Sequence, residues 1–164
     1  MPLPSTMTPI ATQTLASATA TVTFSSIPQT YTDLVIIISA QNATGGDALG
    51  TRFNSDTATN YSNTRIIGNG STASSTRDSN QTAINSGYTR NTSDSPNLIS
   101  VNNYSNSTTY KTLLSRGGNA EAETKASVGL WRSTAAITSI SFINLSGYNF
   151  TSGATFTLYG VKAA

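Results

Sequence analysis

The residues of this chain best suited to acid–base chemistry are two carboxylates, Glu121 and Glu123, which lie in a Gly-rich turn beside Arg116 and Lys125. In an extended segment, residues i and i+2 point the same way, so the two carboxylates could flank a bond as a glycosidase pair does. Two solvated turn residues would have the same spacing. We favour this second interpretation, because nothing else in the turn belongs to such a site.

Two of the commonest catalytic residue types are missing from the sequence, since the chain has no histidine and no cysteine. This excludes Ser–His and Cys–His nucleophile pairs, HExxH metal sites, disulfides and thiolate ligands. Asp47 and Asp56 flank Arg52 in predicted loops, but a calcium site needs several carboxylates close together. We therefore predict that the protein is not an enzyme and has no catalytic residue, no cofactor and no bound metal.

The distribution of charge and apolar residues excludes two further classes of partner. Nine basic residues are spread singly from Arg52 to Lys162, whereas binding to a phosphate backbone needs a concentrated basic surface. The longest apolar run, residues 34–38, is far too short to span a bilayer. We expect neither nucleic acid nor a membrane to be a partner.

Aromatic residues leave one binding hypothesis open. Trp131 is the only tryptophan, and seven tyrosines accompany it, at positions 31, 61, 88, 104, 110, 148 and 159. Aromatic faces bordered by Asn and Asp side chains bind sugars by stacking and hydrogen bonding. Burial of Trp131 in the core is the alternative, and we favour it.

The hydrophobic pattern predicts strands throughout and no helix. Alternation with a period of two recurs in short runs separated by Gly, Asn, Asp and Ser, which is typical of an antiparallel sandwich or barrel. The run at residues 34–38 is apolar on both faces, so we expect a central strand that is covered on both sides. The pattern predicts about nine strands, at 21–24, 32–40, 49–54, 64–67, 97–104, 108–115, 125–132, 137–145 and 154–161.

Two segments lie outside this pattern. Residues 1–18 contain Pro2, Pro4 and Pro9, which exclude a regular helix or central strand, so we predict an extended N-terminal arm, either disordered or ordered on a neighbouring subunit. Residues 19–164 would form a single sandwich domain. Residues 71–96 are polar, with Ile84 and Tyr88 as apolar anchors, and predict a surface hairpin near 83–89 or a long functional loop.

Three segments of the chain resemble small virion structural proteins of tailed phages, notably marine and cyanobacterial ones. They are FSSIPQTYTDLVIIISA (24–40), TRFNSDTATNYSNTRIIGNG (51–70) and GLWRSTAAITSISFINLSGYNFTSGATFTLYGV (129–161). The likeness covers nearly the whole chain after the N-terminal segment. It implies an all-β, jelly-roll-like antiparallel β-sandwich of about eight to nine strands, often assembled as a trimer. It carries over no catalytic residue.

On this basis we expect a capsid decoration (cement) protein, made in the host cytoplasm and bound to the outer capsid surface of the virion. Its partners would be the major capsid protein and further copies of itself, in a homotrimer. The alternative is a receptor-binding or fibre-tip module that recognises cell-surface glycans through Trp131, the tyrosines and the 71–97 loop. Under the first hypothesis, the segments free to contact a partner are the arm and the loop, through Pro2, Leu3, Pro4, Pro9, Ile10, Ile84 and Tyr88.

Overall fold

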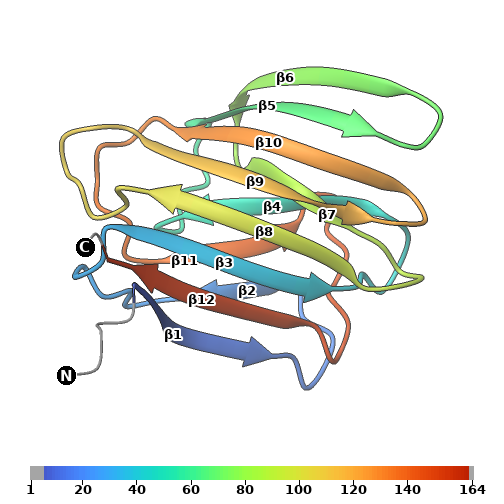
Figure 1. The fold of residues 1–164 in the computed structure, drawn as a ribbon, viewed down its shortest axis with the longest axis horizontal. Helices are drawn as coiled ribbons and strands as arrows, with labels where there is room; N and C mark the ends of the chain where they lie inside the picture. The colour runs from blue at the N-terminus through green and yellow to red at the C-terminus, as the bar shows by residue number, and fades with distance from the viewer. Residues whose placement is uncertain (1–5, 163–164) are drawn as a thin grey trace.

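The computed structural model describes residues 6–162, and within this range the chain forms twelve strands and no helix (Figure 1). This part of the chain accordingly has no helix able to cross a membrane. The strands are β1 (Met7–Thr14), β2 (Thr21–Phe24), β3 (Asp33–Ala40), β4 (Asp47–Phe53), β5 (Tyr61–Gly68), β6 (Ala73–Gln81), β7 (Ile84–Thr89), β8 (Ser95–Asn102), β9 (Lys111–Asn119), β10 (Glu123–Trp131), β11 (Ile140–Asn144) and β12 (Thr155–Val161).

The strands form two sheets that pack face to face. One sheet has eight strands in the order β1-β12-β3-β8-β9-β10-β5-β6, and the other has four in the order β2-β11-β4-β7. All strand pairs are antiparallel, and the chain crosses between the sheets repeatedly. In Figure 1 the larger sheet lies in front of the smaller one. The predicted all-β antiparallel sandwich is confirmed.

The core follows from the alternation along each strand. In β3, Leu34, Ile36 and Ile38 point inward and are fully or almost fully buried, and Phe156 and Leu158 of β12 lie beside them. Phe142 of the small sheet packs against Phe156, with ring centroids 5.7 Å apart. This part of the interior, between β2, β11 and β4 and the facing strands, is apolar.

Beneath β7, beyond Ile84 at the start of this strand, the interior is polar instead. Its buried residues include Lys125 and Ser127 of β10, Ser115 of β9 and Asn97 of β8. The Asn97 carboxamide accepts a hydrogen bond from the backbone N–H of Tyr88 and donates one to its carbonyl, at 3.1 and 3.0 Å, which ties β8 to β7 across the two sheets. The sandwich thus has an apolar half and a hydrogen-bonded polar half.

The number of strands and the N-terminal segment depart from expectation. There are twelve strands rather than eight to nine, because β1, β6 and β7 lie where the sequence indicated an arm and a loop. Residues 7–14 are extended, as expected, but they form an edge strand that pairs with β12 of the same chain. Pro9 is compatible with this edge because a strand there has a free side that needs no N–H donor.

The prediction that β3 is covered on both faces was wrong. β3 lies between β12 and β8 within the larger sheet, and its inward face is buried. Its outward face is not covered by any described segment, and 45% of the Ile37 side chain is exposed. The small sheet covers one side of the large sheet only, so the apolar outward residues of β3 belong to the surface.

Candidate functional site

The outer face of the eight-stranded sheet carries the main exposed apolar surface of the described chain. Strand registers align its outward residues in two neighbouring rows that cross the strands. One row contains Tyr159, Val35, Ser100, Leu114, Val128 and Thr64. The other contains Thr157, Ile37, Leu98, Arg116, Ala126 and Ile66. We call these two rows the outer apolar face.

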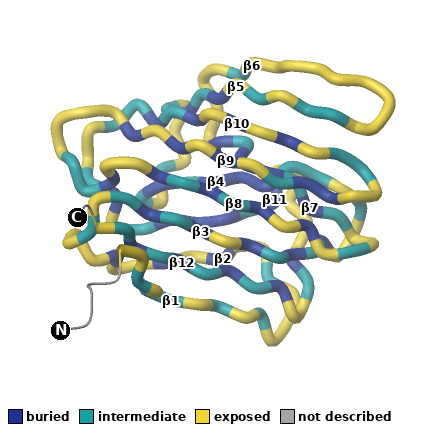
Figure 2. Tube along the Cα trace, in the orientation of Figure 1, coloured by how far each residue is buried: buried dark blue, intermediate teal, exposed yellow. Residues whose placement is uncertain are grey.

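Large aliphatic side chains are widely open to solvent on this face. The exposed fraction is 45% for Ile37, 63% for Ile66, 58% for Leu114 and 55% for Val128. Figure 2 shows exposed stretches recurring along the strands of the larger sheet, between buried positions. Single exposed apolar residues are ordinary, but contiguous ones on a monomer mark interaction surfaces. Their alignment in adjacent rows makes this face the strongest candidate for a binding surface.

The outer apolar face is hollowed at its centre. A depression of about 360 Å³ is lined by Leu98, Ser100, Leu114, Arg116 and Ala126. A broader one of about 620 Å³ adjoins it and extends over Ile37, Pro96 and Gly118 towards the turn at residues 119–121. Leu98 and Arg116 line both depressions. The hollows are shallow and largely apolar, so they are suited to side chains of a partner surface rather than to an enclosed small substrate.

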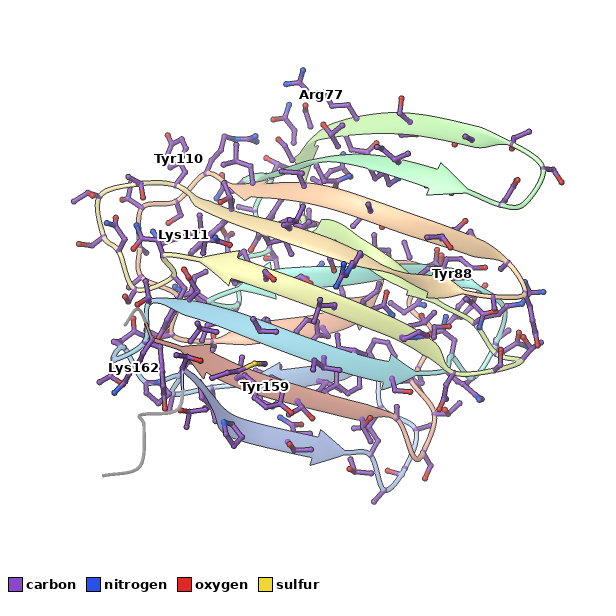
Figure 3. All side chains as sticks on the ribbon, in the orientation of Figure 1. Arg77, Tyr88, Tyr110, Lys111, Tyr159 and Lys162 are labelled. Carbon is purple, nitrogen blue, oxygen red and sulfur yellow. The ribbon has the colours of Figure 1, made fainter. Side chains whose placement is uncertain are left out.

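Positive charge accompanies this apolar surface. Arg116 and Arg77 are exposed, and the guanidinium group of neither makes an ion pair or hydrogen bond within residues 6–162. In contrast, Arg65 pairs with Asp78, and Arg132 donates to Ser62, Thr59 and Asn80. Arg77 projects at the rim of the sheet (Figure 3). A partner that contributes carboxylates would satisfy both guanidinium groups.

The candidate carboxylate pair, Glu121 and Glu123, is not assembled as a glycosidase site. Glu121 Oε2 accepts a hydrogen bond from Thr92 Oγ1 at 2.6 Å, in the exposed turn. Glu123 begins β10, and its Oε1 lies 3.0 Å from the buried amine of Lys125. The two carboxylates therefore have separate partners. Glu121 is an exposed turn residue, as we expected, but Glu123 belongs to β10 and is only 20% exposed, so the expectation of a solvated turn residue was wrong for it.

Asp47 and Asp56 likewise serve local structure. Asp47 Oδ2 accepts from the backbone N–H of Ser146, whereas Asp56 accepts from Ala58, Asn60 and Trp131. Residues 6–162 contain no group of three or more acidic side chains placed to hold a metal ion. Asp56 stabilises its own loop, whereas Asp47 is the first residue of β4 rather than a loop residue and holds the segment that follows β11.

Trp131 is buried rather than available to a sugar. Its ring stacks with Tyr61, with centroids 6.3 Å apart, and packs against Phe53 at 5.6 Å. Burial raises the pKa of Tyr61 to about 12, and its hydroxyl donates to the carbonyls of Phe53 and Asp56. The favoured interpretation of Trp131 as a core residue is confirmed, so the glycan hypothesis loses its main aromatic platform.

The expected partner-contact residues are scattered over the structure. Pro2, Leu3 and Pro4 lie outside the described residues. Pro9 is exposed on β1, and Ile10 packs against the core beside a bulge. Ile84 is fully buried against Leu113 and Gly129, so it offers no surface contact. Tyr88 is half-buried, and its ring faces the Lys125 amine at 5.5 Å.

The sequence analysis missed two features that the alternation of inward and outward residues along the strands could have revealed. Five neighbouring strands each carry a large apolar residue at an outward position: Ile37, Leu98, Leu114, Val128 and Ile66. Lys125 shares its face of β10 with Trp131, six residues on, which places a lysine in the interior. Both patterns can be recognised only when the inward face of the strand is known, and that face depends on which sheet packs against it.

Comparisons with known proteins give little further information. No protein-family model and no curated protein matches the chain. Among solved structures, the chain is similar to one from the structure of infectious bursal disease virus Gt strain, with 10% sequence identity and a TM-score of 0.14. That alignment covers 94% of this chain and 42% of the other, so this chain spans less than half of the length of its counterpart. The comparisons assign the chain to no family.

Proposed function

We propose that this protein is a capsid decoration protein that binds the outside of a phage head, with the outer apolar face as its contact with the shell. The observation that carries the proposal is the alignment of Ile37, Leu114, Val128 and Ile66 in two exposed rows on an uncovered sheet. The assignment to a virion rests on the resemblance of its sequence to small structural proteins of tailed phages.

The chemistry of the outer apolar face supports this proposed contact. Apolar side chains bury their surface on a stable partner, and the unpaired Arg116 and Arg77 favour acidic groups opposite them. A shell assembled from many copies of one protein offers the same acceptor patch at every site. The partner that we propose is the major capsid protein, through an apolar patch bordered by carboxylates.

The mechanism is mechanical. A sandwich seated on the shell adds buried interface area to capsid subunits that hold packaged DNA, and each added contact raises the free energy needed to separate them. A homotrimer would place three such faces on one local symmetry site and would bind more tightly than a single copy, through multivalency. No catalytic step is involved.

The glycan-binding alternative receives no such support. Its platform relied on Trp131, which is buried against Phe53 and Tyr61. The 71–97 loop that was to complete the site instead forms β6, β7 and the start of β8. We therefore do not propose a second function.

Quantitative mass spectrometry of the purified virion tests the location. A copy number close to that of the major capsid protein, or a simple fraction of it, is the expected result. A few copies to a dozen per particle would place the protein on the tail and overturn the proposal. Native mass spectrometry of the isolated chain tests the trimer, each protomer contributing 17.1 kDa.

Binding to undecorated heads tests the contact surface. The double variant L114N/V128N should bind at least about tenfold more weakly, because it makes the centre of the face polar. Leu145→Asn is the matched control: Leu145 is also exposed (42%), but it follows β11 of the opposite sheet. Equal binding by the double variant and the control would exclude the outer apolar face.

A further inference from the structure

A second site lies inside the polar half of the sandwich, around the amine of Lys125. Only 4% of this side chain is exposed. Its Nζ lies 3.0 Å from Glu123 Oε1, 3.2 Å from the carbonyl oxygen of Gly87 and 3.4 Å from Oδ1 of Asn85. A buried amine thus contacts a carboxylate and a carboxamide at once, and the carboxamide comes from the other sheet.

The protonation chemistry of the pair favours a reactive amine. Burial lowers the pKa of Lys125, and the hydrogen bond and charge of Glu123 oppose this effect without cancelling it. Transfer of one proton from the ammonium to Glu123 gives Lys125 its neutral form, which burial of the amine favours. The product is an uncharged amine, which is a nucleophile, next to a protonated carboxyl.

The backbone directs Asn85 towards this amine. The pairing of β4 with β7 shifts register here: Leu49 pairs with Gly87 and Gly50 with Asn85, so Ser86 is an extra residue in β7. Such a bulge re-aims neighbouring side chains. The ring of Tyr88, labelled in Figure 3, faces the amine at 5.5 Å and limits the access of water.

We propose that Lys125 and Asn85 join in an intramolecular amide bond between Lys125 Nζ and Asn85 Cγ, with Glu123 as the proton shuttle. The bond links β10 of the large sheet to β7 of the small sheet and closes a ring between residues 40 apart in sequence. It goes beyond the proposed function, and its test does not depend on any virion.

The reaction balances without a cofactor or an oxidant. The Lys125 ammonium gives a proton to Glu123, and the Nζ lone pair attacks Asn85 Cγ while the carbonyl electrons move to Oδ1. The tetrahedral intermediate collapses, the Cγ–Nδ2 bond breaks, and Nδ2 leaves with protons relayed from Nζ by Glu123. A lysine ammonium and a carboxamide thus become a secondary amide and an ammonium ion.

The fold accelerates the proposed reaction by holding the two reacting groups in position. Amine and carboxamide are held at contact distance by two packed sheets, which replaces a bimolecular encounter by an intramolecular one. Lys111 provides a contrast in the same fold: it is also buried, but its amine donates to the carbonyls of Thr109 and Thr134, which are backbone groups. It has a buried amine without a neighbouring carboxamide or carboxyl group, so we expect it to stay unmodified.

The intact mass of the folded wild-type chain is the direct test. The mass should be lower than the sequence mass by one ammonia. After denaturation, an amine-labelling reagent should modify two of the three lysines, Lys111 and Lys162, but not Lys125. Trypsin should release residues 78–90 joined to residues 117–132, because a modified Lys125 is not cleaved.

Variants assign the roles. Lys125→Arg and Asn85→Ala should have their full sequence mass, and Glu123→Gln, which keeps the shape but cannot accept the proton, should lose ammonia at least about tenfold more slowly. Lys162→Arg is the matched control, since this lysine is exposed, and should still lose ammonia. A wild-type chain with its full mass and three labelled lysines would overturn the proposal, and this result requires no variant to fold.

Discussion

The indole Nε1 of Trp131 donates a hydrogen bond to Asp56 Oδ2 at 2.7 Å, across 75 residues of sequence. Asp56 also accepts from the backbone N–H of Ala58 at 2.8 Å and from Asn60 Nδ2 at 3.0 Å. One carboxylate therefore organises the β4–β5 loop and anchors it to the end of β10. Asp56, which we considered as a metal ligand, and Trp131, which we considered as a platform for a sugar, are thus hydrogen-bonded to each other.

Replacing Asp56 by Asn should lower the free energy of unfolding by about 1–3 kcal/mol at neutral pH, because an acceptor for a buried indole N–H is lost or weakened. Denaturant unfolding followed by fluorescence of the single tryptophan measures this directly. Asp94→Asn is the control: Asp94 is exposed and accepts one hydrogen bond, from Ser39, so the change should stay within about 0.5 kcal/mol.

The Asp56 carboxylate should also make the free energy of unfolding depend on pH in the acid range. Burial alone would raise the pKa of Asp56, but the hydrogen bonds from Asn60, Trp131 and Ala58 outweigh it and lower the pKa below its ordinary value of 3.8. A lowered folded-state pKa means that the stabilisation is present above the ordinary pKa and is lost as pH falls through the lowered one. Urea unfolding below pH 4 should show a steeper loss for the wild type than for Asp56→Asn. Parallel curves would contradict this assignment.

At alkaline pH the corresponding group is Tyr61. Burial raises its pKa from 10.0 to about 12, so the unfolded chain ionises this phenol before the folded one does. Stability from Tyr61 is therefore complete below pH 10 and is lost as pH rises towards 12. Tyr61→Phe should lose less stability than the wild type between pH 9 and 11, as measured by urea unfolding. Tyr110→Phe, at an exposed tyrosine, should behave as the wild type.

The adjacent residues Ile36 and Ile37 should differ sharply in their contribution to stability. Ile36 is fully buried and Ile37 is 45% exposed on the outer apolar face. Ile36→Ala should cost about 2–5 kcal/mol through lost burial and a cavity. Ile37→Ala should cost well under half of that in the isolated chain, as measured by chemical denaturation. Similar losses would mean that the outer face is already covered, for example by a second copy.

Two strand glycines make a matched test of packing. A Cβ on Gly129 would meet the side chains of Ile84 and Leu113, whereas one on Gly68 would meet nothing within 4 Å. Gly129→Ala should therefore destabilise by about 1–3 kcal/mol through overpacking. Gly68→Ala should be neutral or stabilising by up to about 1 kcal/mol, because alanine restricts the unfolded chain. Thermal unfolding of both variants resolves the difference.

Most strands were predictable from sequence because apolar residues recur at every second position, on the inward face in β2 and β12 and on the outward face in β10. β2 has the predicted bounds, and β12 differs by one residue. β6 was missed because it is exposed on both faces and has no alternation, as its sequence ASSTRDSNQ shows. β7 was missed because Gly87 and the bulge at Ser86 interrupt its period of two. β1 was missed because Pro9 is compatible only with an edge.

The candidate surfaces were much less predictable. Sequence alone determined the all-β class and the exclusion of histidine and cysteine chemistry, because alternation and composition are local properties. Tertiary structure decided that only one face of β3 is covered, and that Lys125 meets Asn85. The alternation of side chains along a strand determines which of them share a face. Which of the two faces points inward depends on the sheet that packs against the strand. That depends on pairings between residues far apart in the chain.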